Sequence, residues 1–441
     1  MIDIDRRFPI PHVNHLAFSE FICLTLIVPF ALFPTPERFL IFLALPVLWM
    51  MQWWVTHHFV PRTPLDLSLF GLSLMILVSL YASYDIAISL PGIAALVFGI
   101  AFFYTVVLWA QTRRRLWIGI LVFGILGFVI SLAGLFGTRW GSKVPGFASV
   151  VALFPPRLLG VVGIDEGVNP NVLAGTLLWV LPLALLLARF VILKGWLRRK
   201  TFLSVTIFLL AFVTSGVFIL TQSRGGYIAF AITALCLFVV FLPTKRYQLI
   251  AVGLLVVLIL VGAVIAYSNR DVFDRLLKNG DAADAALSLD TLEGRVEIWS
   301  RALYGIEDFP FTGMGMNTFR KIVHVLYPLF LINPDQDIGH AHNEFLQAAL
   351  DLGIPGLIAF ISLYLVAFWM LIQIWRGASG DDRELTKTLV LGLGGGLFAH
   401  LLFGLTDAVI FAAKPAILFW MLLGLIAALY KSSSEKKILI H

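Results

Sequence analysis

The amino-acid sequence predicts an all-α, polytopic membrane protein with about twelve transmembrane helices and a helical cap on one face. Hydrophobic residues make up 60% of the 441 positions and charged residues only 13%; the mean hydropathy is +0.94. Soluble domains are about half apolar and a quarter charged. Runs of about 20 apolar residues recur along the chain, the length that a membrane span needs. These runs are continuous rather than alternating, which favours helices over a closed barrel.

The apolar runs predict where each span begins and ends, within a single transmembrane domain over residues 1–441. The run that begins near residue 17 has no clear small-residue cleavage site after it, so we interpret it as a retained helix and not a signal peptide. The expected spans are residues 17–36, 38–54, 65–83, 91–110, 116–136, 170–193, 202–221, 226–242, 247–267, 343–374, 386–405 and 415–430.

Basic residues in the short loops predict the orientation of these spans. They gather in alternate loops, such as the one holding Arg113–Arg115, and in both terminal segments. By the positive-inside rule both termini are then cytoplasmic, and the long loop 268–342 lies on the outer side. The formal net charge of +6 is scattered over these loops, which argues against a nucleic-acid partner.

The loop 268–342 is the one large segment expected outside the membrane, and its patterns predict a folded helical cap. "NRDVFDRLLK" is typical of a short amphipathic helix. "TLEGRVEIWSRALYGI" predicts a second, with Thr291 as N-cap and one apolar face. That face is expected to hold Leu292, Val296, Trp299 and Leu303. "NTFRKIVHVLYP" predicts a third helix, ended by Pro328.

Polar residues from distant parts of the chain are expected at one membrane level, where the spans meet the cap. Such convergence is the pattern expected of a site at the mouth of a bundle. The residues are Asn169 and Asn171 before span 170–193, Arg224 in "TQSRGGY", Arg295 in "EGRVEIW", His342 and Asn343 in "HAHNEF", and Asp407 in "GLTDAVIF".

Each of these residues also has a purely structural explanation. Arg224 could anchor a helix at the interface, and Arg295 could be a solvated charge. Asp407 could pair with Lys414. His342 and Asn343 could start a helix, as could Asn169 and Asn171 on either side of Pro170. We assign no role to His340 or His324, because an HxH pair without a third ligand is a poor metal site.

The spacing His342-Asn343, nine residues, Gly353, two residues, Gly356 is more specific than its parts. Together with "SRGG" and the "GR" of the outer loop, it resembles the O-antigen ligase and polymerase superfamily over roughly residues 165–410. The HNx9GxxG form is most similar to the ligases. On this resemblance, the superfamily's arginines fall on Arg224 and Arg295, its histidine on His342 and its acidic residue on Asp407.

The resemblance implies an inverting glycosyltransferase at the periplasmic face of a Gram-negative inner membrane. Its donor would be O-antigen on undecaprenyl pyrophosphate and its acceptor a sugar hydroxyl of the lipid A core. Arg224 and Arg295 would hold the pyrophosphate, because the guanidinium fork binds phosphate in a bidentate way. His342 would be the general base.

Further expectations concern substrate binding and cofactors. Asn343 and Asp407 would orient His342 or bind sugar hydroxyls, Asn171 would bind substrate, and Arg157 would meet phosphates of the lipid A core. No HExxH motif or cysteine-based metal cluster appears in the sequence, so we expect no cofactor or metal. We also expect a monomer.

Three alternatives remain open from the sequence. An O-antigen polymerase and a transferase that modifies a protein hydroxyl would share the chemistry and differ only in the acceptor. A transporter is a rival of another class. Two observations disfavour it: no pair of interrupted helices at matching positions suggests inverted repeats, and the charges gather at the outer level rather than the midplane.

Overall fold

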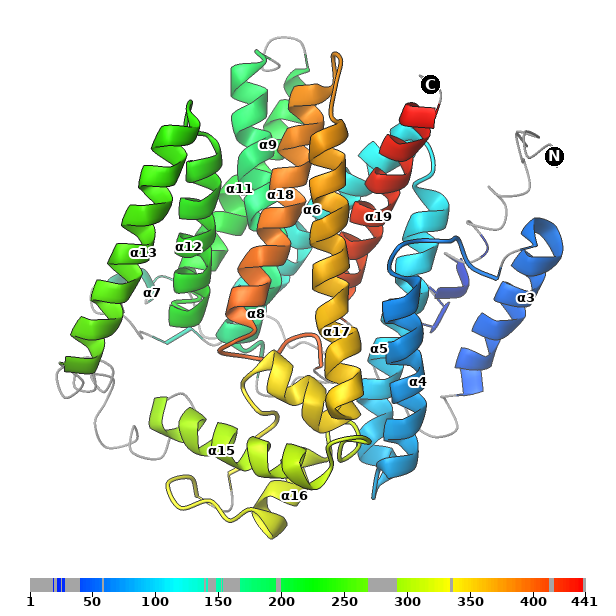
Figure 1. The fold of residues 1–441 in the computed structure, drawn as a ribbon, viewed down its shortest axis with the longest axis vertical. Helices are drawn as coiled ribbons and strands as arrows, with labels where there is room; N and C mark the ends of the chain where they lie inside the picture. Colours follow the sequence, from blue (N-terminus) through cyan, green and yellow to red (C-terminus); the bar gives the residue numbers. More distant parts are fainter. Residues whose placement is uncertain are drawn as a thin grey trace.

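Figure 1 shows a computed structural model of the chain, a bundle of helices in which the described residues form no strand. The structure describes residues 19, 22–24, 26–27, 40–57, 59–138, 140–141, 148–151, 153, 167–195, 200–268, 292–333, 336–411 and 416–438. The elements are η1 (Leu40–Leu43), α3 (Ala44–Thr56), α4 (Asp66–Ala82), α5 (Ile86–Trp109), α6 (Arg113–Gly137), α7 (Ala148–Val151), α8 (Pro170–Leu178), α9 (Leu181–Leu193), α11 (Thr201–Leu220), α12 (Arg224–Val240), α13 (Lys245–Ser268), α15 (Leu292–Asp308), α16 (Phe319–Leu326), α17 (Glu344–Gly377), α18 (Arg383–Phe403) and α19 (Ile417–Ile438).

The all-α fold class predicted from the apolar runs is confirmed for the described residues. Among them, six helices are long and apolar enough to cross a membrane, or up to seven if the bent pair α8 and α9 is one span. Three further apolar helices are shorter, at 40–54, 66–82 and 224–240. The count of about twelve spans therefore stays a prediction. The first expected span, 17–36, lies mostly outside the described residues.

The segment 170–193, expected as one span, is interrupted. Its two helices α8 and α9 are bent by 47°. Pro182, at the start of α9, has no N–H with which to continue the hydrogen-bond ladder of α8. Because α17 also contains a non-helical residue, Gly353, two helices are interrupted. One of the two arguments against a transporter, that no pair of interrupted helices lies at matching positions, is weakened by this finding.

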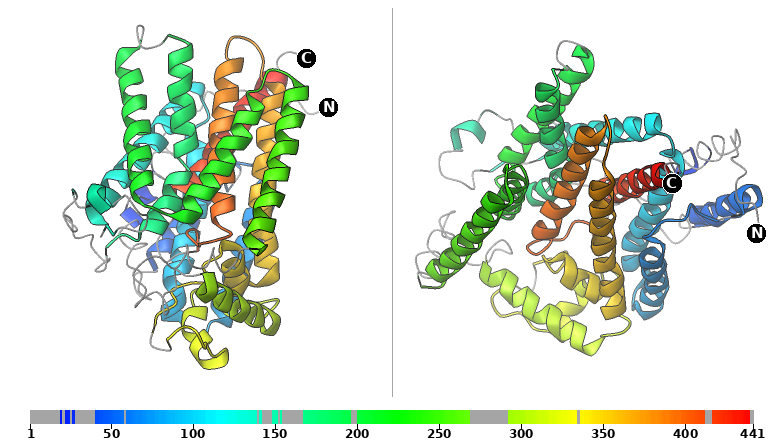
Figure 2. Two further views of the ribbon diagram at one scale, coloured as in Figure 1. Left: turned by 90° about the vertical axis from the view of Figure 1, so that its left-hand side faces the viewer. Right: turned by 45° about the horizontal axis from the view of Figure 1, so that its top comes forward.

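The core of the bundle is built from large apolar side chains that pack between α5, α6, α8, α9, α17, α18 and α19. Trp179, Phe360, Phe403, Phe419 and Trp420 are each at most 1% exposed. α19 runs through this core and contacts α5, α6 and α17. α3 and α13 lie at opposite edges of the bundle (Figures 1 and 2).

α15 and α16 lie together at one end of the bundle, opposite the end where the chain terminates (Figure 1). A second apolar cluster joins them to the start of α17 through Ile298, Ala302, Phe319 and Leu350. The buried carboxylate of Glu297 accepts hydrogen bonds from the backbone amides of Phe330 and Leu331 at 2.6 and 3.0 Å, respectively. These contacts define the cap; which side of the membrane it occupies stays a prediction.

Two of the three helices expected in the cap are confirmed, as α15 and α16. The third expected helix, "NRDVFDRLLK", and Thr291 lie outside the described residues. The apolar face expected on α15 is wrong: Val296 and Leu303 are each 52% exposed, whereas Ile298 and Ala302 are fully buried. The contact with α17 selects the face that carries Ile298 and Ala302, and sequence periodicity alone could not identify that contact.

Candidate active site

The start of α17 is fixed by Asn343. As N-cap, its side-chain oxygen accepts hydrogen bonds from the amides of Phe345 and Leu346, both at 3.0 Å. Its side-chain amide donates to the carbonyl of Leu405 at 3.0 Å. This confirms the helix-start explanation of Asn343 and joins α17 to the segment after α18. His342, one residue earlier, has a φ of 47°, an uncommon conformation that is retained where surrounding contacts enforce it.

The glycine spacing downstream of His342 has a steric explanation. Gly353 has a φ of 69° and interrupts α17. A Cβ at this position would lie 2.7 Å from backbone atoms of Phe311, so only glycine fits. On either side, the amide of Ile354 donates to Pro310 O and the amide of Met314 donates to Leu350 O, both at 2.7 Å. The cap therefore docks onto the interruption in α17, which fixes the position of His342 at the N-terminus of α17.

Glu344 is a buried residue of the site that sequence analysis missed. Its carboxylate is 0% exposed. It accepts hydrogen bonds from the amides of Val409, Ile410 and Phe411 at 2.8, 2.9 and 3.1 Å, respectively. An acidic residue at the edge of an apolar run, directly after His342-Asn343, was the available signal. Glu344 holds the segment that carries Asp407 against the start of α17.

Asp407, in the segment after α18, lies beside two histidines that precede α17. The Nδ1 atom of His342 lies 3.3 Å from Asp407 Oδ1, and the Nε2 atom of His340 lies 3.7 Å from the same oxygen. The two imidazole rings are 4.4 Å apart between centroids. The side chain of Asp407 is only 5% exposed and that of His342 only 15%. The expectation that His342 and Asp407 converge is confirmed.

His340 is the group whose importance the sequence analysis underestimated. The reason given there, that the HxH pair lacks a third possible ligand, is wrong: ligand atoms of His340, His342 and Asp407 all lie within 4.8 Å of one another. However, His340 Nδ1 accepts a hydrogen bond from the His342 amide at 3.1 Å. In neutral His340 the proton is therefore on Nε2, facing Asp407. A metal ligand needs a lone pair at Nε2, which this tautomer of His340 lacks, so the three residues fit an electrostatic contact around Asp407 better than a metal centre.

The electrostatic environment reinforces this protonation pattern. Although the His340 side chain is 22% exposed, burial lowers its pKa to about 4, against the opposing effect of the Asp407 carboxylate. Burial by itself would raise the pKa of Asp407, but contact with His342 and the nearby charges of His340 and Arg295 lower the pKa below its ordinary value. Asp407 is thus a carboxylate and His340 a neutral imidazole at pH 7.

α15 supplies two further side chains to the site. Arg295 Nη1 donates to the carbonyl of Thr406 at 2.7 Å, and Trp299 Nε1 donates to the carbonyl of His342 at 3.4 Å. The two residues are four apart in the chain, so they share one face of the helix. Arg295 is therefore held beside Asp407, as its effect on the pKa of Asp407 also indicates.

Arg224 lies on a further helix that approaches the site. It begins α12, whose N-cap Ser223 accepts a hydrogen bond from the Gly226 amide. A Cβ at Gly225 would lie 2.6 Å from Thr406 Oγ1, so glycine permits α12 to approach the Thr406–Asp407 segment. Arg295 contacts the carbonyl of this same Thr406. Arg224 itself is exposed, at the start of the helix that approaches Thr406.

Two expected substrate-binding residues are not part of this cluster as described. Asn171 lies in the first turn of α8, where its amide donates to the Asn169 side chain at 2.8 Å. The helix-start explanation of Asn169 and Asn171 is confirmed. α8 does pack against α12 and α18, which places Asn171 on an element next to the site. Arg157 and Lys414 lie outside the described residues.

Comparison with known families agrees with the motifs. Residues 208–361 match the family described as O-Antigen ligase. This match to part of the chain supports an O-antigen ligase superfamily member. The matched segment contains Arg224, Arg295, His342 and Gly353, whereas Asp407 lies beyond its end. No curated protein matches the chain.

Membership and apolar helices together indicate a membrane protein. The O-antigen ligase family also implies, in general terms, a lipid-linked polysaccharide and a lipid acceptor as substrates. The geometry around Asp407 is the part of the molecule on which a more specific function has to rest.

Proposed function

We propose that the protein is an O-antigen ligase, which transfers a glycan from undecaprenyl pyrophosphate to a sugar hydroxyl of the lipid A core. The observation that carries the proposal is the convergence of His342, Asp407 and Arg295 from three separate segments on one buried group. A buried carboxylate and imidazole are costly unless paired, so such a group is typical of a functional site.

In the proposed reaction, His342 is the general base. With its Nδ1–H facing Asp407, the Nε2 lone pair of His342 is left to accept the proton of the acceptor hydroxyl. Asp407 fixes this tautomer and stabilises the imidazolium that forms, the role that a carboxylate plays in catalytic triads. General-base catalysis of this kind contributes about 10²–10⁴-fold to the rate.

The bond changes follow from this assignment. The acceptor oxygen attacks the anomeric carbon as the bond from that carbon to the pyrophosphate oxygen breaks, with inversion of configuration. The proton passes to His342 Nε2, and the electron pair leaves with undecaprenyl pyrophosphate. Arg295, which donates to the carbonyl of Thr406, and Arg224, at the start of α12, stabilise the negative charge that grows on the leaving group. Arginine suits this position because it is always ionised and its fork matches two phosphate oxygens.

Surface polysaccharide of a host lacking the gene tests the proposal. Complementation with the unchanged gene should restore lipopolysaccharide that carries long O-antigen. Complementation with His342→Ala should leave lipopolysaccharide without O-antigen, while lipid-linked long chains are retained. His324→Ala, on α16 of the helical cap, is the matched control and should restore O-antigen on lipopolysaccharide.

The same experiment separates the alternatives. Capping with a single repeat unit in the deletion strain would contradict a ligase and identify a polymerase. Unchanged lipopolysaccharide would contradict both and point to another acceptor, such as a protein hydroxyl, or to transport.

A further inference from the structure

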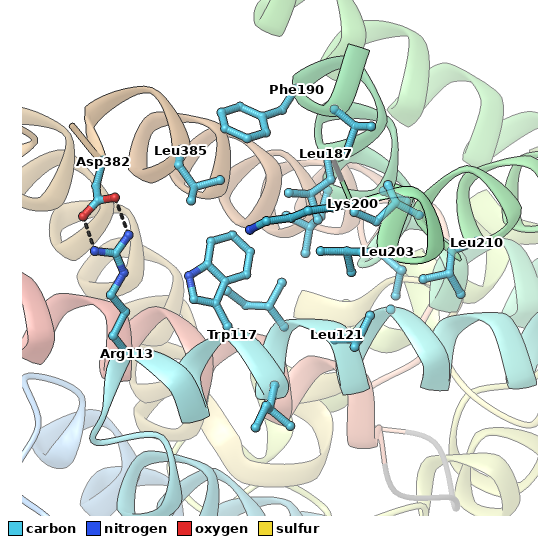
Figure 3. A pocket seen from close by; sticks show the side chains of 18 residues that line it. Arg113, Trp117, Leu121, Leu187, Phe190, Lys200, Leu203, Leu210, Asp382 and Leu385 are labelled. Carbon is cyan, nitrogen blue, oxygen red and sulfur yellow. Dashed lines mark hydrogen bonds and ion pairs between the residues drawn. The ribbon is translucent and has the colours of Figure 1, made fainter. Parts of the chain in front are cut away.

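A cavity of about 500 Å³ lies at the other end of the bundle, away from the cap. It is lined by α6, α9 and α11, with the start of α18 at its rim (Figure 3). Its volume is within the range of about 300–1,000 Å³ that is typical of sites for small ligands. Its lining shares no residue with the group around Asp407.

The walls of the cavity are apolar over most of their length. Along α11 the lining runs from Lys200 at the rim through Leu203 and Ile207 to Leu210. At 1.5 Å rise per residue this is a depth of about 15 Å, roughly half the thickness of a hydrocarbon core. α9 faces it with Leu183, Ala184, Leu187 and Val191, and α6 with Ile120, Leu121 and Gly124. The shape and lining suit an extended hydrocarbon chain.

The rim of the cavity is polar and carries an excess of positive charge. Arg113 and Asp382 form an ion pair there. The side chain of Lys200 extends over the cavity towards the ring of Trp117 (Figure 3). Arg113, Asp382 and Lys200 together leave one net positive charge. A tryptophan and a lysine beside an apolar wall are typical of the level where head groups meet hydrocarbon.

We propose that this cavity is a binding site for an anionic phospholipid of the bilayer, with one acyl chain along α11 and the phosphate head group beside Lys200. The charge at the rim favours an anionic over a neutral head group, and the apolar depth favours an acyl chain over a soluble anion. The site is separate from the glycosyl-transfer site and does not depend on the proposed function. In the orientation predicted from the sequence, the lipid belongs to the cytoplasmic leaflet.

The test uses the full chain, purified in mild detergent and titrated with phosphatidylglycerol or phosphatidylcholine. Binding is measured by native mass spectrometry and by the rise in melting temperature. Lys200→Glu reverses the charge at the rim, and Lys194→Glu, on an exposed residue outside the cavity lining, is the matched control. Since each basic residue near a head group contributes about 1 kcal/mol, Lys200→Glu should weaken phosphatidylglycerol binding roughly tenfold or more.

Ala184→Phe, which fills the cavity from α9, provides a second and independent measurement. We expect it to abolish retention of phosphatidylglycerol while Lys194→Glu retains it. Equal binding of the two lipids, unchanged phosphatidylglycerol binding in Lys200→Glu or in Ala184→Phe, or retention of a polyprenyl phosphate in place of phospholipid would each overturn the proposal.

Discussion

At the cap end of the bundle polar side chains are buried against one another, whereas at the opposite end they stand at the exposed rim of an apolar cavity. Glu344 is 0% exposed and receives three backbone hydrogen bonds. By contrast, the side chains of Arg113 and Asp382 are 54% and 31% exposed. The first arrangement is costly if any partner is removed, and the second costs little. The difference indicates that the cap end requires a fixed geometry, whereas the other end requires only charge.

A large effect is expected at Arg295. Arg295→Lys should lower the rate of glycan transfer about 10²–10³-fold, because the ammonium cannot contact both the Thr406 carbonyl and the developing charge on the donor. Transfer is measured with purified lipid-linked donor and lipid A core acceptor. Arg320→Lys, at an exposed ion pair of the cap, should keep its activity. If both variants were equally active, the role of Arg295 would be structural.

The next effect concerns the anchor of the Asp407 segment. Glu344→Gln leaves one of the amides of Val409, Ile410 and Phe411 without an acceptor, which should destabilise the protein by up to about 3 kcal/mol. The measurement is thermal melting in detergent. The control is Glu384→Gln on the exposed first turn of α18, which should melt as the unchanged protein does. Equal melting of the two variants would show that the buried carboxylate does not hold this segment.

A pH dependence follows from His340. Its pKa is about 4 in the folded protein and about 6.5 when unfolded, so the unfolded state binds more protons between these values. Stability is therefore lost as pH falls through this window, by about 1 kcal/mol from pH 6.5 to 5.5. In His340→Gln the melting temperature should depend less on pH over this range than it does in His324→Gln. An unaltered slope would show that His340 is not buried as described.

The smallest effect is expected at the exposed pair of the other end. Asp382→Asn should change the stability by less than about 1 kcal/mol, because the pair with Arg113 is screened by water. A loss as large as that of Glu344→Gln, measured in the same melting experiment, would remove the contrast between the two ends.

How far the sequence predicts this fold depends on whether the signal is local. Continuous apolar runs predicted α4 to α6, α11 to α13 and α17 to α19 because length and hydropathy are local properties. The bend between α8 and α9 was missed because apolar residues continue across it and only Pro182 marks it. The buried face of α15 was missed because Ile298 and Val296 are equally apolar, and the contact with α17 decides between them.

The site shows the same division. His342, Arg295 and Arg224 were predicted because each lies in a short motif of unusual composition. Glu344 and His340 were not, because their meaning depends on partners more than 60 residues away in the chain: Glu344 on the amides that follow Asp407, and His340 on Asp407 itself. Such pairings need coordinates, since nothing in a local window specifies them.

The central claim is that Asp407 acts through His342 and not by an independent contact with substrate. A double-mutant cycle in single-turnover transfer, with His342→Ala, Asp407→Asn and the combined variant, tests it most directly. We predict that His342→Ala alone lowers the rate about 10²–10⁴-fold and that adding Asp407→Asn lowers it no further. Effects of the two substitutions that multiply in the combined variant would contradict the account.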